Sequence, residues 1–251
     1  MIKDGALSDP NVDAIFGQHI TTEISDGKFG FKTGPMMASA DELYFTVIGK
    51  GGHGAHPHKV VGPIPIAAQI ITSLQTVISR TRDLLMPSVL TIGSIHGGAT
   101  TNVISNEVKL AGTFRAMNET WREKGLSMIR RTAKETAKSL GGKCKVEISR
   151  GYPVLVNQEK ETDLVRSTAI KLFEKKSVAE IQPVMGAEDF LFFLQKVPGA
   201  FWWIGAGNKS IGATASIHSS KFMIDENALM HGAALLAFVA TEYLNLREHK
   251  N

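Results

Sequence analysis

Cysteine is almost absent from this sequence. Its 251 residues include one, Cys144, so no disulfide can form within the chain. Disulfide frameworks are typical of secreted proteins, whereas thiols stay reduced in the cytosol. The start of the chain shows no secretory signal, because Lys3 and Asp4 interrupt it almost at once. We therefore expect a cytoplasmic protein.

The sequence also lacks a strong charge and is poor in aromatic residues. The formal net charge is +4 and 7% of the residues are aromatic. The basic residues are spread out, apart from residues 122–145. Nucleic-acid-binding domains usually combine a concentrated basic stripe with aromatic side chains that stack on bases. We expect no nucleic-acid partner.

No uninterrupted apolar run is long enough to suggest a membrane span. The longest apolar stretch, residues 228–246, is broken by His231 and Glu242. It is typical of a helix with one face in a protein core, so we expect no membrane partner. With 43% apolar residues, the chain can bury one large core or two smaller ones.

The middle of the chain alternates between strand and helix patterns. Apolar residues recur with a period of two or at helical spacing in six segments. Strands are expected at residues 42–49, 89–95, 107–117 and 143–149, and helices at 63–80 and 119–140. This β-α-β-β-α-β order predicts a ferredoxin-like domain with helices on an antiparallel sheet.

The flanking segments predict an α/β layer of their own. A buried strand is expected at residues 12–19, with His19 at its exit. The other expected elements are helices at residues 162–175, from 186 on and at 227–246, and an aromatic-rich strand at 200–204. We therefore predict that residues 1–37 and 153–251 form one domain and that residues 38–152 are inserted into it.

The most conspicuous motif is a glycine-rich run that holds three histidines within six residues, Gly49-Lys50-Gly51-Gly52-His53-Gly54-Ala55-His56-Pro57-His58. Glycine lets the backbone approach a ligand closely. Imidazole binds metals, moves protons or holds anions near neutral pH. Metal ligands, catalytic groups and turn residues are all open interpretations of this run.

Three other polar positions are candidates when taken singly. His19 and His218 could belong to a zinc or manganese site completed by other ligands, or they could be packed or solvated histidines. Glu188 could line a site or simply favour the start of a helix. His96, His231 and His249 are interpreted as structural or solvent-exposed.

Asn102 and Arg115 lie near strand ends in the inserted segment. Together they could bind a carboxylate or an oxyanion. Alternatively, Arg115 forms a surface ion pair.

The motifs share an order that resembles one known family. The run of three histidines is preceded by Gly17-Gln18-His19. It is followed by Thr101-Asn102-Val103-Ile104, Gly112-Thr113-Phe114-Arg115, Gly151-Tyr152-Pro153, Gly186-Ala187-Glu188-Asp189-Phe190 and Ile217-His218-Ser219. The chain resembles the M20 metallopeptidases over essentially its whole length. The similarity is to the amidohydrolase branch, which holds hippurate hydrolases, N-acyl-amino-acid amidohydrolases and plant auxin-conjugate hydrolases.

The resemblance implies a zinc-peptidase-like α/β catalytic domain interrupted by a ferredoxin-like lid that also forms a homodimer. It implies hydrolysis of the amide bond of N-acyl amino acids or short peptides at two divalent metals, zinc or manganese first and nickel or cobalt as alternatives. His19 and His218 match metal ligands. His53 matches a catalytic histidine that reaches the active site of the partner subunit and stabilises the tetrahedral intermediate there.

The resemblance also implies substrate-binding roles. Asn102 and Arg115 match lid positions that hold the substrate, and Glu188 matches an acid near it.

Other ligands of the family have no counterpart in this chain. They are a Cys-and-His motif followed by an aspartate, and a Glu-Glu pair that supplies the general base and a ligand. Cys144 lies on a predicted lid strand and cannot replace them. The chain is therefore expected to correspond to the C-terminal two-thirds of such an enzyme, with little activity alone. The alternative is a catalytically inactive dimerisation or binding remnant.

Overall fold

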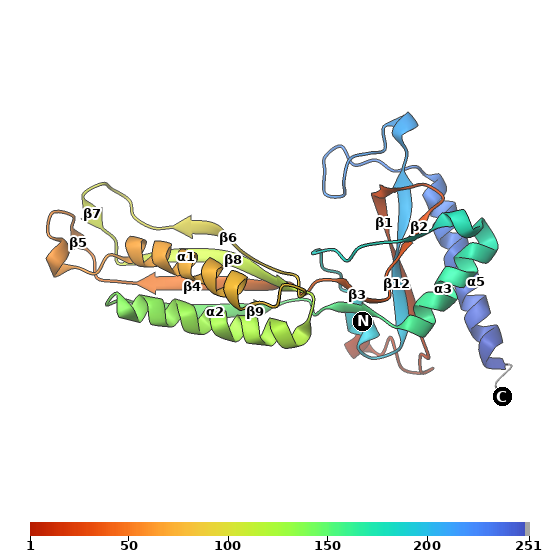
Figure 1. The fold of residues 1–251 in the computed structure, drawn as a ribbon, viewed down its shortest axis with the longest axis horizontal. Coiled ribbons are helices and arrows are strands. Elements are labelled where there is room, and N and C mark those ends of the chain that lie inside the picture. Colours follow the sequence, from red (N-terminus) through yellow and green to blue (C-terminus); the bar gives the residue numbers. More distant parts are fainter. Residues whose placement is uncertain (249–251) are drawn as a thin grey trace. The chain divides into compact units, whose positions relative to one another are not determined.

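The computed structural model describes residues 1–248 and divides the chain into two compact units (Figure 1). Unit 1 comprises Met1–Met36, Leu155–Val184 and Asp189–Asn251, and unit 2 comprises Met37–Val154 and Met185–Glu188. The predicted boundaries fell after residues 37 and 152, and the structure places them after residues 36 and 154. The four residues 185–188 belong to unit 2 rather than to the flanking domain.

Unit 2 is a four-stranded antiparallel sheet with two long helices. Its main elements are β4 (Asp41–Ile48), α1 (Pro63–Thr81), β6 (Ser88–His96), β8 (Glu107–Ala116), α2 (Glu119–Ser139) and β9 (Lys143–Arg150). The strands lie in the order β6-β8-β4-β9, and every neighbouring pair is antiparallel. The six elements expected for this segment are therefore present in the expected order.

The core of unit 2 lies between the sheet and its helices. Alternate residues of β4, including Leu43, Phe45 and Val47, are buried on one face. Ile70 of α1 and Ile129 of α2 cover them from the helix side. A strand has a side-chain period of two and a helix a period of 3.6, so each element presents one apolar face to this core. Burying each such side chain contributes roughly 1.5–3 kcal/mol to the stability of the folded state.

Two features of unit 2 were not predicted from the sequence. The histidine-rich run contains a two-residue strand, β5 (Gly52–His53), which pairs with β7 (Val103–Ile104). Strands this short leave no periodic pattern in the sequence. Arg122, which begins the basic segment, is buried, although arginine side chains are mostly exposed in folded proteins.

Unit 1 contains a mixed four-stranded sheet in the order β1-β12-β2-β11. Its strands are β1 (Ile15–Ser25), β2 (Phe29–Phe31), β11 (Val178–Glu180) and β12 (Gly199–Gly207). β1 runs parallel to β12, β2 runs antiparallel to it, and β11 runs parallel to β2. Two helices, α3 (Glu159–Phe173) and α5 (Asn227–Glu248), pack against each other and against β12.

Shorter elements complete the chain. β3 (Gly34–Met37) pairs with β10 (Leu155–Asn157), and α4 covers Leu191–Leu194. Single 3-10 turns occupy Ile2–Asp4, Pro57–Lys59, Lys175–Ser177 and Lys209–Ile211.

Two expectations for unit 1 need correction. β1 continues to Ser25, so His19 lies within the strand and not at its exit. The β-branched residues that follow His19, among them Thr21 and Ile24, favour this extension. The helix expected from residue 186 is also much shorter, because α4 begins at Leu191 and leaves Glu188 in an irregular segment.

One face of α5 lies in the core of unit 1. Ala228, Leu235 and Val239 are buried against the sheet, as the sequence predicted, whereas Leu229 and Phe238 on other faces are exposed. By length and composition alone, residues 227–246 could cross a membrane. The expected absence of a membrane partner therefore stays a prediction.

Candidate functional site

His19 has the hydrogen-bond pattern of a metal ligand. It lies opposite Trp203 of β12, with the two ring centroids 5.1 Å apart in an edge-to-face arrangement. Its Nδ1 lies 2.8 Å from the carbonyl oxygen of Ile20. A carbonyl can only accept, so Nδ1 carries the proton and the neutral ring presents the Nε2 lone pair. Metal-binding histidines commonly donate their other ring N–H to such an acceptor.

His218 lies in an exposed turn of unit 1. Its φ of 65° is in the left-handed region. Thr22 Oγ1 of β1 donates to the carbonyl oxygen of Ala215 over 2.8 Å. This hydrogen bond ties the loop that carries His218 to the strand that carries His19.

The donor set for a metal is incomplete in the described residues. Within residues 1–248, no group of three or more His, Cys, Asp or Glu side chains is placed to hold an ion. This applies to the run of three histidines as well as to His19 and His218. The ring of His56 lies 5.6 Å from that of His53 and 6.0 Å from that of His58. His19 therefore fits a metal as one ligand, but this part of the chain does not form a metal centre by itself.

His53 has the opposite hydrogen-bond pattern. It is exposed on β5, opposite Val103. The backbone N–H of Ala55 donates to its Nδ1 over 3.1 Å. Because Nδ1 accepts, the proton of the neutral ring is on Nε2. His53 thus presents an N–H donor where His19 presents a lone pair.

Asn102 is a close neighbour of His53. Its backbone carbonyl accepts from the N–H of Gly54 over 2.8 Å, and Thr100 Oγ1 donates to its Oδ1 over 3.5 Å. A Cβ on Gly54 would lie 3.2 Å from the Asn102 carbonyl oxygen, so glycine permits this approach. The β5–β7 pair brings His53 and Asn102 together.

Arg115 and the segment of Glu188 form a second group in unit 2. Arg115 Nη1 donates to the carbonyl oxygen of Met185 over 2.9 Å. The N–H of Ala38 donates to the carbonyl oxygen of Gly186 over 2.9 Å, which holds the same segment. Glu188 is half-buried and already takes part in an interaction.

These two groups lie at opposite ends of the sheet of unit 2. β5 and β7 lie side by side beyond the end where β8 begins, and Arg115 is near the other end of β8 (Figure 1). From Glu107 to Arg115 a strand spans about 25 Å. Within one chain, the structure therefore does not bring Asn102 and Arg115 to a common ligand.

The remaining histidines lie apart from these groups or outside the described residues. His231 Nδ1 lies 3.1 Å from Asp26 Oδ1, which fits a structural role. His96 is exposed at the end of β6. His249 is outside the described residues.

The contacts of Trp203 and Met185 escaped the sequence interpretation. Trp203 lay in the expected aromatic strand, but its position opposite His19 depends on the β1–β12 pairing. Met185 holds Arg115 through its backbone, and a backbone acceptor leaves no signal in residue type.

Comparison with known proteins decides the family. The family described as Peptidase family M20/M25/M40 matches residues 1–242. The chain belongs to this family. This confirms the resemblance drawn from the ordered motifs.

Named relatives in the family give its chemical range. The chain is 36% identical to a thermostable carboxypeptidase of Saccharolobus solfataricus, over 98% of this chain and 61% of that protein. It is 34% identical to an N-acetyl-L-cysteine deacetylase of Bacillus subtilis, over 99% of this chain and 58% of that protein. The chain thus spans about three-fifths of the length of these relatives.

A solved structure of the family shares the fold. It is a dinuclear metal-binding peptidase of the M20 family from Bacillus subtilis, with a TM-score of 0.80 and 26% identity. The match covers 97% of this chain and 60% of that one.

Proposed function

We propose that this chain acts in the metal-dependent hydrolysis of an amide bond in N-acyl amino acids or short peptides with a free carboxylate. Family membership supports the reaction class. The named carboxypeptidase and deacetylase support the substrate class. Both names describe cleavage of an amide bond that releases an amino acid. The proposed setting is the cytoplasm, without a nucleic-acid or membrane partner.

His19 and His218 are the proposed metal ligands in this chain. The Nε2 lone pair of His19 supports its assignment, and the metal-binding relative supports two divalent ions per active site. Zinc or manganese fits a site with imidazole and carboxylate ligands, and nickel or cobalt is the alternative. When bound, such ions polarise the carbonyl that is attacked.

One observation carries the proposal, the opposite hydrogen-bond patterns of His19 and His53. A lone pair suits a metal ligand, whereas an Nε2–H suits a donor to the oxygen that becomes negative as the amide is attacked. Asn102 lies beside His53 and can orient the same substrate. Arg115 uses one of its five N–H donors on Met185, which leaves the others for the substrate carboxylate.

The separation along β8 supports a site shared between two copies of the chain. His53 and Asn102 lie about 25 Å along the sheet from Arg115 and the Glu188 segment. One substrate cannot contact both ends. We therefore propose a homodimer formed through unit 2, in which His53 and Asn102 of one protomer face Arg115 and Glu188 of the other.

Metal content and turnover, measured together in a protein that joins this chain to a segment supplying the remaining metal ligands and the general base, test the histidine roles. His19→Ala should lower bound metal and activity in parallel. His53→Ala should keep the metal while turnover of an N-acetyl amino acid falls about 100- to 1000-fold, as for the loss of an oxyanion donor. Loss of metal from His53→Ala in proportion to activity would make His53 a ligand and overturn its assignment.

Mixing two inactive variants of that joined protein tests the shared site. His53→Ala and Arg115→Ala, mixed and allowed to exchange subunits, should recover about a quarter of wild-type activity. Half of the dimers would then be mixed, and each mixed dimer would hold one intact site. A mixture as inactive as its components would show that His53 and Arg115 act within one chain.

A further inference from the structure

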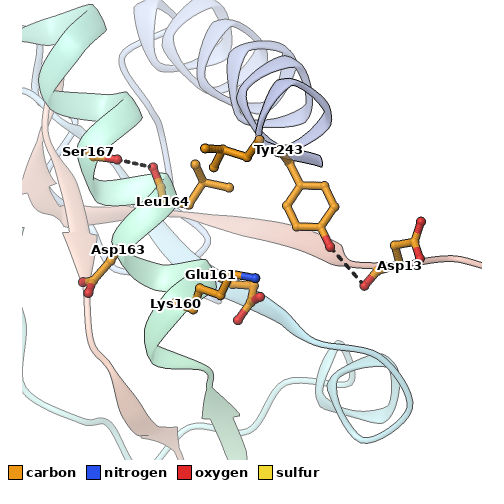
Figure 2. Close-up of a pocket in the computed structure, with 8 residues that line it drawn as sticks. Asp13, Lys160, Glu161, Asp163, Leu164, Ser167 and Tyr243 are labelled. Atoms are coloured by element: carbon orange, nitrogen blue, oxygen red, sulfur yellow. Dashed lines mark hydrogen bonds between the residues drawn. The ribbon is translucent and has the colours of Figure 1, made fainter. Parts of the chain in front are cut away.

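Unit 1 contains a cavity of about 750 Å³ between α3 and α5. Figure 2 shows its lining residues, which include Glu161 and Leu164 of α3 and Tyr243 of α5. Tyr243 donates from its hydroxyl to the carbonyl oxygen of Asp13 over 3.3 Å, which closes one side. Because Asp13 precedes β1 and His19 lies six residues further on, the two positions are roughly 20 Å apart along the chain.

Glu161 is a buried carboxylate with no hydrogen-bond or ion-pair partner among residues 1–248. It is 5% exposed. Glu161 occupies the third position of α3, where a glutamate often accepts from the N-cap N–H. Here the N-cap residue Gln158 donates that N–H to the carbonyl oxygen of Gly199 over 3.3 Å. Glu161 therefore does not accept the N-cap N–H, which is the usual structural role of a glutamate at this position.

The buried carboxylate of Glu161 determines the sign of the charge that the ligand should carry. Two charged residues that line the cavity, Asp13 just before β1 and Lys160 in the first turn of α3, are exposed, so water screens their charges. Asp163 already pairs with Arg166 at 2.7 Å. The first turn of α3 adds a partial positive charge of about half a unit, which is smaller than the full charge of Glu161. A cation is favoured inside the cavity.

The apolar residues that line the cavity indicate that the ligand also has an apolar part. Leu164, Leu246 and the ring of Tyr243 provide surfaces for methylene groups, and an aromatic face also attracts cations. We propose that this cavity binds an organic cation, a primary ammonium or guanidinium group on a short apolar chain, paired with Glu161. Its source is either a free amine or a lysine or arginine side chain of a peptide. This site lies outside the proposed amide-hydrolysing function.

Titration calorimetry with simple probes tests the site. Butylammonium and butylguanidinium represent the free amine, and the peptide acetyl-Ala-Arg-Ala-amide represents the side chain. At least one cationic probe should bind saturably, while neutral pentanol should not. Binding confined to the peptide would identify a protein side chain as the source. No saturable binding by any cationic probe would overturn the proposal.

Two variants locate the binding. Glu161→Gln keeps the shape of the side chain and should lower the affinity for the cationic probe about 10-fold or more. This is the usual loss when a charged hydrogen-bond partner is removed. Glu159→Gln removes an exposed charge from the same turn outside the cavity and should change affinity less than twofold. Equal affinity for wild type and Glu161→Gln, or equal losses in both variants, would overturn the assignment to this cavity.

Discussion

Arg122 and Asp41 form a buried, two-pronged ion pair in unit 2. Arg122 Nε donates to Asp41 Oδ2 over 2.8 Å, and Nη2 donates to Oδ1 over 2.6 Å. The side chains are 3% and 0% exposed. Burial lowers the pKa of Arg122, but the hydrogen bond and charge of Asp41, with help from Glu119, outweigh it and leave this pKa raised.

The pair lies where the chain enters and leaves unit 2. Asp41 begins β4, and its Oδ1 also accepts from the N–H of Gly151 over 3.3 Å. Glu119 accepts from Arg122 and from the N–H of Val154, over 3.2 and 2.6 Å. The network therefore fastens the two connecting segments to the sheet.

Replacing Arg122 should destabilise unit 2 strongly. Arg122→Met leaves Asp41 buried and unpaired, and the expected loss in unfolding free energy is about 3–5 kcal/mol. Denaturant unfolding measures this loss, and hydrogen exchange of the β4 amides localises it. Arg150→Ala removes an exposed pair with Glu123 and should cost under about 1 kcal/mol. Similar losses in both variants would contradict a special role for the buried pair.

Arg115 should discriminate substrates by their carboxylate. Its remaining N–H donors can form two parallel hydrogen bonds to the two oxygens of a carboxylate. The ammonium group of lysine cannot reproduce this geometry. Arg115→Lys should lower kcat/KM for an N-acyl amino acid about 10- to 100-fold and leave the value for the corresponding amide nearly unchanged. Arg80→Lys, on the exposed side of α1, is the control and should affect neither. Equal losses for acid and amide would assign Arg115 a positioning role.

Gly51 should be essential for the placement of His53. A Cβ there would lie 2.6 Å from the carbonyl oxygen of Ile104. Gly51→Ala should push β5 away from β7, and a displacement of about 1 Å can cost 100-fold in turnover. Metal content should not change. Gly93→Ala meets no atom within 4 Å and is the matched control. Wild-type turnover in Gly51→Ala would show that the β5–β7 pairing does not position His53.

Cys144 should react slowly until the protein unfolds. Burial raises the pKa of its thiol to about 11, with a small opposing effect of Lys134. Iodoacetamide labelling at pH 8, followed by mass spectrometry, should be much slower for the native protein than for the protein in urea, because the thiolate is the reactive form. Equal rates would place the thiol in solvent.

The same shift predicts a pH dependence of stability. The folded state holds the thiol proton more tightly than the unfolded state, in which the pKa is about 8.5. The contribution is complete below that pH and is lost as pH rises towards 11, by up to about 3 kcal/mol. Unfolding of Cys144→Ala should show a shallower decline over this range. Parallel declines would contradict the raised pKa.

The sequence was sufficient where an element buries one face along its whole length. Leu43, Phe45 and Val47 alternate, and α1 and α2 carry apolar residues at helical spacing, so the elements of unit 2 were predictable in order. It was insufficient for the short strands β2, β5, β7 and β11, which have too few residues to show a period. It also placed His19 at the end of a strand that continues for six more residues.

The ordered motifs by themselves identified the family. A motif is recognised by its residue types and their order, and both are properties of the sequence alone. Only the tertiary structure decided which candidates meet. It joined His53 to Asn102 and Arg115 to Met185, separated the two groups along β8, and buried Arg122 and Glu161. The physical reason is that local spacing fixes which face of an element is apolar, whereas strand pairing between distant segments fixes which polar groups share a site and which lose contact with water.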